Sequence, residues 1–243
     1  MPLLKGGRTL YGLVLGVLML DTRMPRVPGD VGNAETWPFP VHFSVVKGAD
    51  TSRIMGRDPD PTLLVPFADA ARELERLGAR AITTSCGFLA IFQQELQAAL
   101  SVPMLSSALL QVPFVSRVIA PGKRIAILTE RPNLTERHFN GAGWSAKDVP
   151  VTVCAMPEGA VFPKVFIDQS VAADRDVLER EMVELAVRAA KEPGVGALVL
   201  ECTNFVPFAQ AMRRATGLPV FDLYTLVMQT YLATAAPEFP RGP

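Results

Sequence analysis

Hydrophobic positions in this chain fall into short continuous runs that alternate with longer amphipathic stretches. Residues 12–20 form the first run, and its composition predicts a strand that is buried on both faces. Residues 63–77 instead carry apolar side chains at helical spacing, and Gly78 follows as the expected end of that helix. Between them lies a Pro- and Gly-rich segment, 21–62, in which we expect a long loop and one further strand over 42–46.

The alternation of strand and helix continues through the rest of the chain. We predict strands over 81–84, 104–105, 124–128, 151–155, 197–200 and 220–221, and helices over 88–100, 109–118, 175–191, 205–215 and 223–233, with one more within 133–140. Residues 156–172 are expected to form a loop. Strands that alternate with helices favour the α/β class, in which a mostly parallel sheet is covered on both faces.

One segment of this pattern occurs twice, once around Cys86 and again around Cys202. Each cysteine ends a short apolar run, with a glycine eight residues before it and a proline seventeen residues after it. The repeat predicts two pseudo-symmetric halves, each a mostly parallel sheet with helices on both faces, and an active site in the cleft between them. We expect the first half to comprise residues 1–107 and 223–243, and the second half residues 108–222.

Composition and charge narrow the range of partners. The 24 basic and 24 acidic side chains cancel, and no basic run is interleaved with aromatic residues, so we expect no nucleic-acid partner. Residues 10–20 are too few to span a bilayer as a helix, and no small-residue cleavage site follows them, so we expect no membrane partner. Three widely spaced cysteines fit a reducing cytosol. The sequence therefore favours a soluble cytoplasmic protein with a small-molecule substrate.

Cys86 and Cys202 both fall where a strand ends and a helix begins. The free N–H groups and the positive dipole end of that helix are expected to lower the pKa of the thiol. The alternative is that both are small buried hydrophobic residues, as we expect for Cys154, which lies within a strand and has no counterpart in the repeat. Parallel sheets bind ligands at this edge, which favours the functional interpretation.

The sequence carries no signature of a cofactor. It has no Gly-x-Ser-x-Gly elbow, no dinucleotide- or phosphate-binding glycine motif and no cluster of metal ligands, and both histidines, His42 and His138, are distant from the cysteines along the chain. Two opposed thiols suit proton transfer at carbon, in which one thiolate removes a proton from one face and the other thiol donates one to the opposite face. That chemistry is racemisation or epimerisation.

The segments 83–88, Thr-Thr-Ser-Cys-Gly-Phe, and 200–205, Leu-Glu-Cys-Thr-Asn-Phe, resemble the two cysteine motifs of the aspartate/glutamate racemase superfamily. The resemblance covers most of the chain. That superfamily includes amino-acid racemases, hydantoin racemases, arylmalonate decarboxylases and maleate isomerases. The resemblance implies that Cys86 and Cys202 are the catalytic proton donor and acceptor, that no metal or pyridoxal phosphate is needed, and that the assembly is a homodimer.

The resemblance also points to residues that would bind the substrate. Asp21 and Thr22 look like the Asp-Ser pair that amino-acid racemases place after the first strand, although Asp21 also suits a helix cap or a turn. Thr129 stands where relatives often carry a substrate-binding hydroxyl, and it equally suits an N-cap. The candidates beside the cysteines are Ser85, Gly87, Thr203 and Asn204, and the last three would hold a carboxylate through backbone N–H groups. Arg23, in the loop after the first strand, would pair with a substrate carboxylate or face solvent.

Two residues near Cys202 depart from what such a site would need. Asn204 stands where glutamate racemases typically have histidine and aspartate racemases glutamate, and an amide cannot relay a proton. This argues against free aspartate or glutamate as the substrate and favours a more acidic C–H, as in a hydantoin or a malonate. Glu201 adjoins Cys202, but neighbouring strand residues point to opposite faces, so we expect Glu201 to point away from the site.

From these observations we predict a cofactor-independent racemase or epimerase. Its substrate would be a small carboxylate or amide-containing compound, and protons would move at the carbon next to a carbonyl. A decarboxylase or a cis-trans isomerase of the same superfamily remains an alternative, as does a non-catalytic protein that binds a small molecule.

Overall fold

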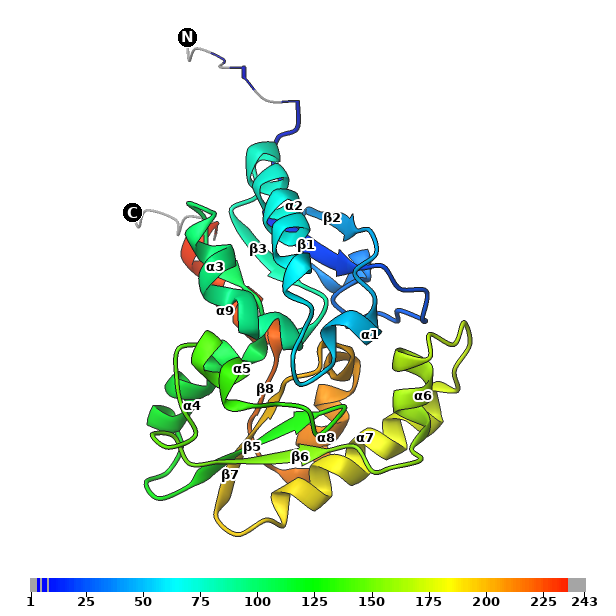
Figure 1. Cartoon of the computed structure of the whole chain (residues 1–243). Helices are drawn as coiled ribbons and strands as arrows, with labels where there is room; N and C mark the ends of the chain where they lie inside the picture. Colours follow the sequence, from blue (N-terminus) through cyan, green and yellow to red (C-terminus); the bar gives the residue numbers. More distant parts are fainter. Residues whose placement is uncertain (1–3, 5, 8, 236–243) are drawn as a thin grey trace, which may run out of the picture.

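Two parallel four-stranded sheets, one above the other, form the frame of the molecule (Figure 1). The structure is a computed structural model and describes residues 4, 6–7 and 9–235. The first sheet has the order β2-β1-β3-β4 and the second the order β6-β5-β7-β8, so the same arrangement occurs twice. The strands are β1 (Leu15–Leu20), β2 (Val41–Val46), β3 (Ala81–Thr84), β4 (Met104–Leu105), β5 (Arg124–Thr129), β6 (Val151–Ala155), β7 (Val195–Leu200) and β8 (Val220–Phe221). The predicted α/β fold of two similar halves is confirmed.

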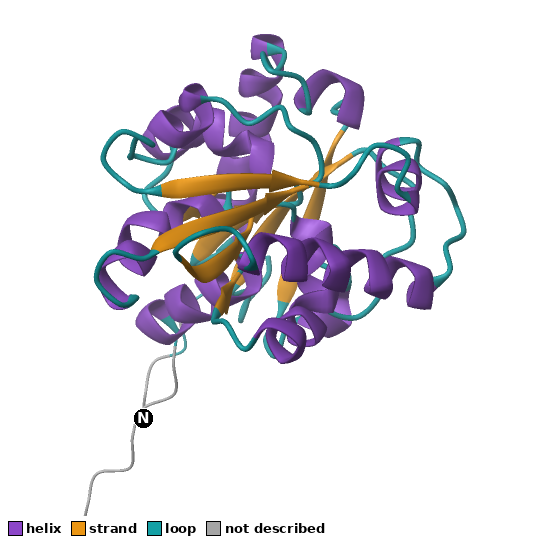
Figure 2. Cartoon of the chain, turned by 90° about the horizontal axis from the view of Figure 1, so that it is seen from below, coloured by secondary structure: helices purple, strands orange, loops and turns teal. Residues whose placement is uncertain are grey.

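Helices lie on both faces of the sheets (Figure 2). The α-helices are α1 (Thr51–Ile54), α2 (Leu64–Leu77), α3 (Gln93–Ala98), α4 (Val112–Val118), α5 (Glu136–Gly141), α6 (Val161–Ile167), α7 (Arg175–Ala190), α8 (Ala209–Thr216) and α9 (Leu223–Thr234). Short 3₁₀ helices are η1 (Ala34–Thr36), η2 (Pro61–Leu63), η3 (Gly87–Phe92), η4 (Ala108–Gln111) and η5 (Thr203–Phe208). No helix in the described part of the chain is both long and apolar enough to cross a membrane.

The central strands are buried on both faces because alternate side chains enter different hydrophobic clusters. In β5, Ala126 and Leu128 pack with α7, whereas Ile125 and Ile127 pack with α4 and α5. The strand β1 is sandwiched in the same way between two clusters. One of these includes Leu223 of α9, so the last helix returns to cover the first sheet. The predicted domain boundaries at 107/108 and 222/223 stay predictions.

The structure corrects two expectations about local structure. The helices predicted to begin directly after the cysteines begin as the 3₁₀ helices η3 and η5, and they become α-helical only at Gln93 and Ala209. The segment 156–172, predicted to be a loop, contains the helix α6. This helix buries Phe162, Val165 and Phe166, whose spacing of three and four residues places them on one helical face.

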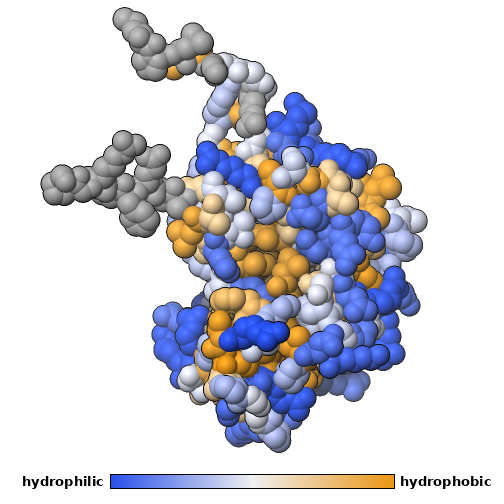
Figure 3. Space-filling view, turned by 90° about the vertical axis from the view of Figure 1, so that its left-hand side faces the viewer, coloured by the Kyte–Doolittle hydropathy of each residue, from blue (hydrophilic) through white to orange (hydrophobic). Residues whose placement is uncertain are grey.

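Polar and apolar groups are mixed on the surface, and Figure 3 shows apolar groups gathered near the middle of one face. Exposed large hydrophobic side chains include Phe114 and Val118 of α4 and Leu232 of α9. The homodimer implied by the sequence resemblance stays a prediction.

Candidate active site

The two repeated cysteines line one pocket. Cys86 follows β3 and is the N-cap residue of η3, and Cys202 follows β7 and is the N-cap residue of η5. Both are free and buried. The apolar wall of the pocket includes Leu20, Phe88 and Phe166. The repeat therefore places both thiols at one site, as predicted.

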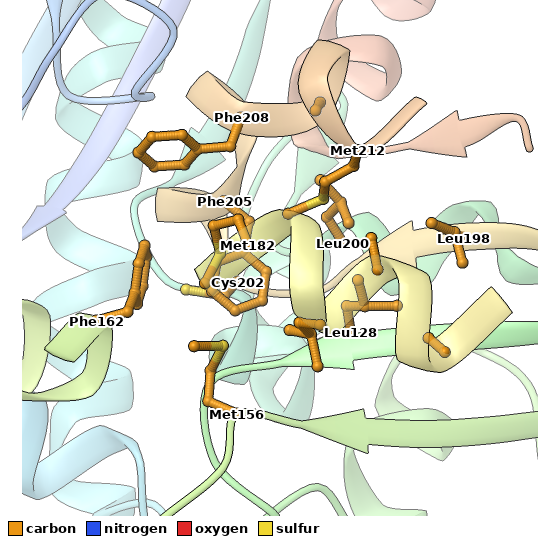
Figure 4. Close-up of a cluster of buried hydrophobic side chains, with 14 of the residues drawn as sticks. Leu128, Met156, Phe162, Met182, Leu198, Leu200, Cys202, Phe205, Phe208 and Met212 are labelled. Carbon is orange, nitrogen blue, oxygen red and sulfur yellow. The ribbon is translucent and has the colours of Figure 1, made fainter. Parts of the chain in front are cut away.

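The wall behind Cys202 is a cluster of buried apolar side chains. Cys202 belongs to a buried cluster with Phe162, Phe205 and Met182, drawn in Figure 4. The Phe162 ring stacks on Phe166, with ring centroids 4.2 Å apart, and meets Phe205 edge-on at 5.0 Å. The helix α6 thus brings Phe166 to the pocket while Phe162 anchors that helix in the core.

The two halves place equivalent residues around the pocket. The backbone N–H of Ser85 donates to the carbonyl of Leu18, and that of Glu201 donates to the carbonyl of Leu128, both at 2.9 Å. Ser85 therefore corresponds to Glu201, and by the same register Leu20 corresponds to Glu130. Both members of each pair line the pocket: Leu20 with Glu130, and Ser85 with Glu201. The first half contributes a leucine and a serine where the second half contributes two carboxylates.

The carboxylates of Glu130 and Glu201 are almost completely buried, with 3% and 1% of their surface exposed. Glu201 accepts a hydrogen bond of 2.7 Å from the Thr129 hydroxyl, and Glu130 faces the Cys202 thiol at 3.6 Å. The Oε1 atom of each has no hydrogen-bond partner among the described residues. Burial raises the pKa of Glu130 to about 8 and that of Glu201 to about 7. Two buried acids with raised pKa values in one pocket make it the candidate functional site.

The expectation that Glu201 points away from the site is wrong. β7 ends at Leu200, so the alternation of strand side chains no longer governs the next residue. Glu201 instead lies against the backbone of the opposite half, where a Cβ at Gly87 would come within 2.3 Å of its Oε1 atom and 2.2 Å of its carbonyl oxygen. Only glycine fits at position 87, because any side chain there would displace Glu201.

The expectation that both thiols have a lowered pKa is also wrong for this structure. Burial raises the pKa of both thiols, and the Glu201 and Glu130 carboxylates raise it further. The backbone N–H groups of Phe88, near Cys86, and of Asn204, near Cys202, act in the opposite direction but are outweighed. Formation of a thiolate at either cysteine therefore requires a nearby proton acceptor or a change in the charge or solvation around the thiol.

Asn204 is held by a chain of polar contacts that leads to the loop after β1. Its amide nitrogen donates to Asp30 at 2.7 Å, which leaves the amide oxygen 3.8 Å from the Cys202 sulfur, where it accepts from the thiol. Asp30 is buried and forms an ion pair of 2.7 Å with Arg26, which in turn donates to the Thr22 hydroxyl at 2.9 Å. Thr22 therefore supports the loop and is not among the residues that line the pocket.

The remaining predicted site residues divide into two groups. Ser85, Gly87 and Thr203 line the pocket, and the Thr203 hydroxyl joins the two halves by donating 2.7 Å to the carbonyl of Ser85. Asp21 and Arg23 are exposed and do not line the pocket. Asp21 accepts from the backbone of Gly48, and Arg23 is exposed, as in the solvent-facing alternative. Met24, the next residue along the chain, lines the pocket.

Thr129 does not line the pocket, but its hydroxyl donates a hydrogen bond to the carboxylate of Glu201, which does. Sequence reasoning missed Glu130, the next residue along, although its position after a central parallel strand was a usable signal. It also missed the pocket residues Thr51, Met55 and Phe166, which come from segments assigned to loops. His138 packs edge-on against Phe88, with centroids 5.1 Å apart, and does not line the pocket. Among the described residues, no group of three or more His, Cys, Asp or Glu side chains is placed to hold a metal ion.

Comparison with known proteins identifies relatives over most of the chain. A family model described as Asp/Glu/Hydantoin racemase matches residues 44–230. A dimethylsulfoniopropionate lyase from Durusdinium sp. clade D is 30% identical over 220 residues, which cover 86% of this chain and 70% of the relative. Dimethylsulfoniopropionate lyase 3 from Emiliania huxleyi is also 30% identical, over 87% of this chain but only 57% of its own length.

Solved structures show the same fold at lower sequence identity. A mutant of arylmalonate decarboxylase matches with a TM-score of 0.61 and 18% identity, over 94% of this chain and 97% of that one. Allantoin racemase from Klebsiella pneumoniae matches with a TM-score of 0.60 and 16% identity, over 90% of this chain and 87% of that one. The resemblance predicted from the two cysteine motifs is confirmed.

Proposed function

We propose that this chain, which belongs to the Asp/Glu/Hydantoin racemase family, is a cofactor-independent lyase that releases a sulfide from a small sulfonio-carboxylate such as dimethylsulfoniopropionate. Membership of this family supports the fold and the superfamily, and the relatives include both racemases and proteins named as lyases. The relatives named as lyases are more similar in sequence than the solved racemases and decarboxylases.

The proposed reaction is a β-elimination. A cysteine thiolate takes a proton from the carbon next to the carboxylate, and the electron pair of that C–H bond forms a double bond to the neighbouring carbon. The bond from that carbon to the sulfonium sulfur then breaks, and its electron pair leaves with the sulfur. The products are a neutral dialkyl sulfide, an unsaturated carboxylate and the protonated thiol, which returns its proton to solvent.

The charge of the pocket is the observation that carries this proposal. Glu130 and Glu201 line it, and none of its lining side chains in the described part of the chain is basic. A dicarboxylate would meet two buried acids, whereas a zwitterion would place its cation beside them. A bound cation would lower the pKa of both carboxylates and stabilise their ionised forms. The rings of Phe88 and Phe166 are also suitable surfaces for a sulfonium group.

The substrate carboxylate needs a separate site, because it would be repelled by the two glutamates. We place it at the backbone N–H groups that follow the cysteines, at Gly87, Thr203 and Asn204. Those groups would also stabilise the negative charge that develops on the carboxylate when the proton leaves. Three free cysteines suit a reducing compartment, so the proposal includes a cytoplasmic location.

A racemase or epimerase is the second candidate. It is favoured by the presence of Cys86 and Cys202 in the same pocket, one from each half, because two opposed thiols can exchange a proton with both faces of one carbon. Its substrate would again need a C–H bond next to a carbonyl.

The test is to incubate the protein with dimethylsulfoniopropionate and measure dimethyl sulfide in the headspace and acrylate in solution. We expect release by the wild type and by the control Cys154→Ala, whose thiol does not line the pocket, and loss of release in Cys86→Ala and Cys202→Ala. In parallel, amino acids, hydantoins and arylmalonates are incubated in heavy water and examined by mass spectrometry. Deuterium uptake there, without sulfide release from the sulfonium compound, would replace the lyase by the racemase.

A further inference from the structure

The surroundings of the two thiols differ although the backbone repeats. Cys202 has the Glu130 carboxylate beside it, and the residue equivalent to Glu130 on the Cys86 side is Leu20. We propose that Glu130 accepts the proton of the Cys202 thiol, so that Cys202 is the thiolate that attacks the substrate proton and Cys86 remains a thiol. This inference rests on the proposed function for its substrate, but not for the proton transfer between the two side chains.

The geometry supports a direct transfer. The Cys202 sulfur lies 3.6 Å from Oε2 of Glu130, within the reach of a hydrogen bond from sulfur, and both groups are buried. The other carboxylate oxygen of Glu130 has no partner among the described residues. The carboxylate is therefore free to take up a proton without first breaking another contact.

The other groups near Cys202 cannot do this. The oxygen of Asn204 also accepts from the thiol, at 3.8 Å, but a neutral amide does not hold a proton. Asp30 fixes that orientation, because it binds the amide nitrogen and so keeps the oxygen towards the sulfur. Glu201 accepts from the Thr129 hydroxyl at 2.7 Å and, unlike Glu130, forms no hydrogen bond with the Cys202 thiol among the described residues. Glu130 is the remaining acceptor that contacts the sulfur.

In the transfer, the S–H bond of Cys202 breaks and its electron pair stays on sulfur, while a new O–H bond forms on Glu130. The negative charge moves from the carboxylate to the sulfur, and the net charge of the pocket does not change. The groups that set the charge balance around Glu130 are Glu201 and Asp168, which raise its pKa, and Arg131, which lowers it. A carboxyl group with a pKa of about 8 is a stronger base than an ordinary glutamate and is better matched to a thiol.

The experiment measures the rate at which iodoacetamide alkylates each cysteine of the whole protein, from pH 5.5 to 10, by peptide mass spectrometry and without substrate. If Glu130 takes the proton, the Cys202 rate rises until Glu130 is ionised, near its pKa of about 8, and then levels off. In Glu130→Gln the plateau should disappear, because the Cys202 rate should keep rising about tenfold per pH unit and exceed the wild-type rate above about pH 8, where the carboxylate that raises the thiol pKa is absent.

Three controls keep the result specific. Glu201→Gln removes the other buried carboxylate and should keep the plateau. Glu130→Asp keeps a carboxylate and should keep the plateau at a lower rate. The Cys86 profile should have no plateau near pH 8 in either the wild type or Glu130→Gln, and in the variant it should shift to lower pH, because the Glu130 carboxylate raises the pKa of Cys86.

Two outcomes would overturn the inference: a wild-type Cys202 profile without a plateau, or a plateau that survives in Glu130→Gln. A protein that shows the predicted alkylation profiles but releases no sulfide would instead contradict the proposed function and leave the proton transfer established. If sulfide is released, its rate in the wild type should level off above about pH 8, and this levelling should be absent in Glu130→Gln.

Discussion

Replacing Glu130 by glutamine should make the protein more stable at high pH and leave it little changed at low pH. Glu130 is an acid whose pKa is raised from 4.5 in the unfolded chain to about 8 in the folded protein. Between these two values the folded state holds a proton that the unfolded state has lost. The free energy of unfolding therefore falls as the pH rises through this window, and the loss is complete above pH 8.

The size of the effect follows from the same two values. At about 1.4 kcal/mol for each pH unit between 4.5 and 8, ionisation of Glu130 costs at most about 5 kcal/mol of stability. Glutamine removes this cost but leaves a buried amide with few partners, which costs about 1–3 kcal/mol. We therefore expect Glu130→Gln to be equal to or slightly less stable than the wild type at pH 5 and about 2–4 kcal/mol more stable at pH 9.

Urea denaturation at intervals between pH 5 and pH 9 measures this difference. The two stability curves should cross, and the control Glu73→Gln should follow the wild type, because Glu73 is exposed on α2 and has a lowered pKa that lies below this range. Parallel curves for Glu130→Gln and the wild type across the whole range would refute the reasoning, since they would mean that Glu130 is ionised at no cost in the folded protein.

Three further predictions concern the packing around the site. Phe162→Ala should lower the free energy of unfolding by about 3–5 kcal/mol, whereas Phe114→Ala, at a half-exposed position, should cost less than about 1 kcal/mol; equal losses in urea denaturation would contradict this. Gly87→Ala should abolish turnover and lower the melting temperature, because its Cβ would meet the Glu201 carbonyl at 2.2 Å; an active, equally stable variant would contradict the packing described. His138 is buried as the neutral form with a pKa lowered to about 4, so its contribution to stability should be lost as the pH falls from about 6.5 to about 4, and His138→Phe should flatten that part of the curve.

Much of the frame could be predicted because it depends on burial. Strands that are covered on both faces appear in the sequence as short apolar runs. Each of the eight strands in the described residues overlaps a strand predicted from the sequence. The helix α6 was missed because it is short, follows Pro157 and Gly159 and contains Pro163, so that local composition outweighed the spacing of its buried side chains. The 3₁₀ helices η3 and η5 have the apolar composition of an α-helix, and sequence spacing alone did not separate the two forms.

The candidate site could be predicted only where it repeats. Cys86 and Cys202 were predicted as site residues because the sequence pattern around each of them is repeated, and both line the pocket. Glu201 was excluded by the alternation of strand side chains, although the repeat aligns it with Ser85, which was retained as a candidate. The repeat was the better guide, because both residues lie one position beyond a strand. Glu130 has no polar counterpart in the first half, so the repeat gave no sign of it.

This difference between the halves bears on the choice between lyase and racemase. A racemase works in both directions, so each thiol must in turn remove and donate the proton, and similar surroundings for both would serve that exchange. An elimination needs one proton acceptor only. Here the carboxylates of Glu130 and Glu201 both stand in the half that carries Cys202, and the corresponding positions on the side of Cys86 are Leu20 and Ser85. A symmetric frame with one activated thiol is what one-way proton removal requires, and it supports the proposed elimination over exchange between two enantiomers.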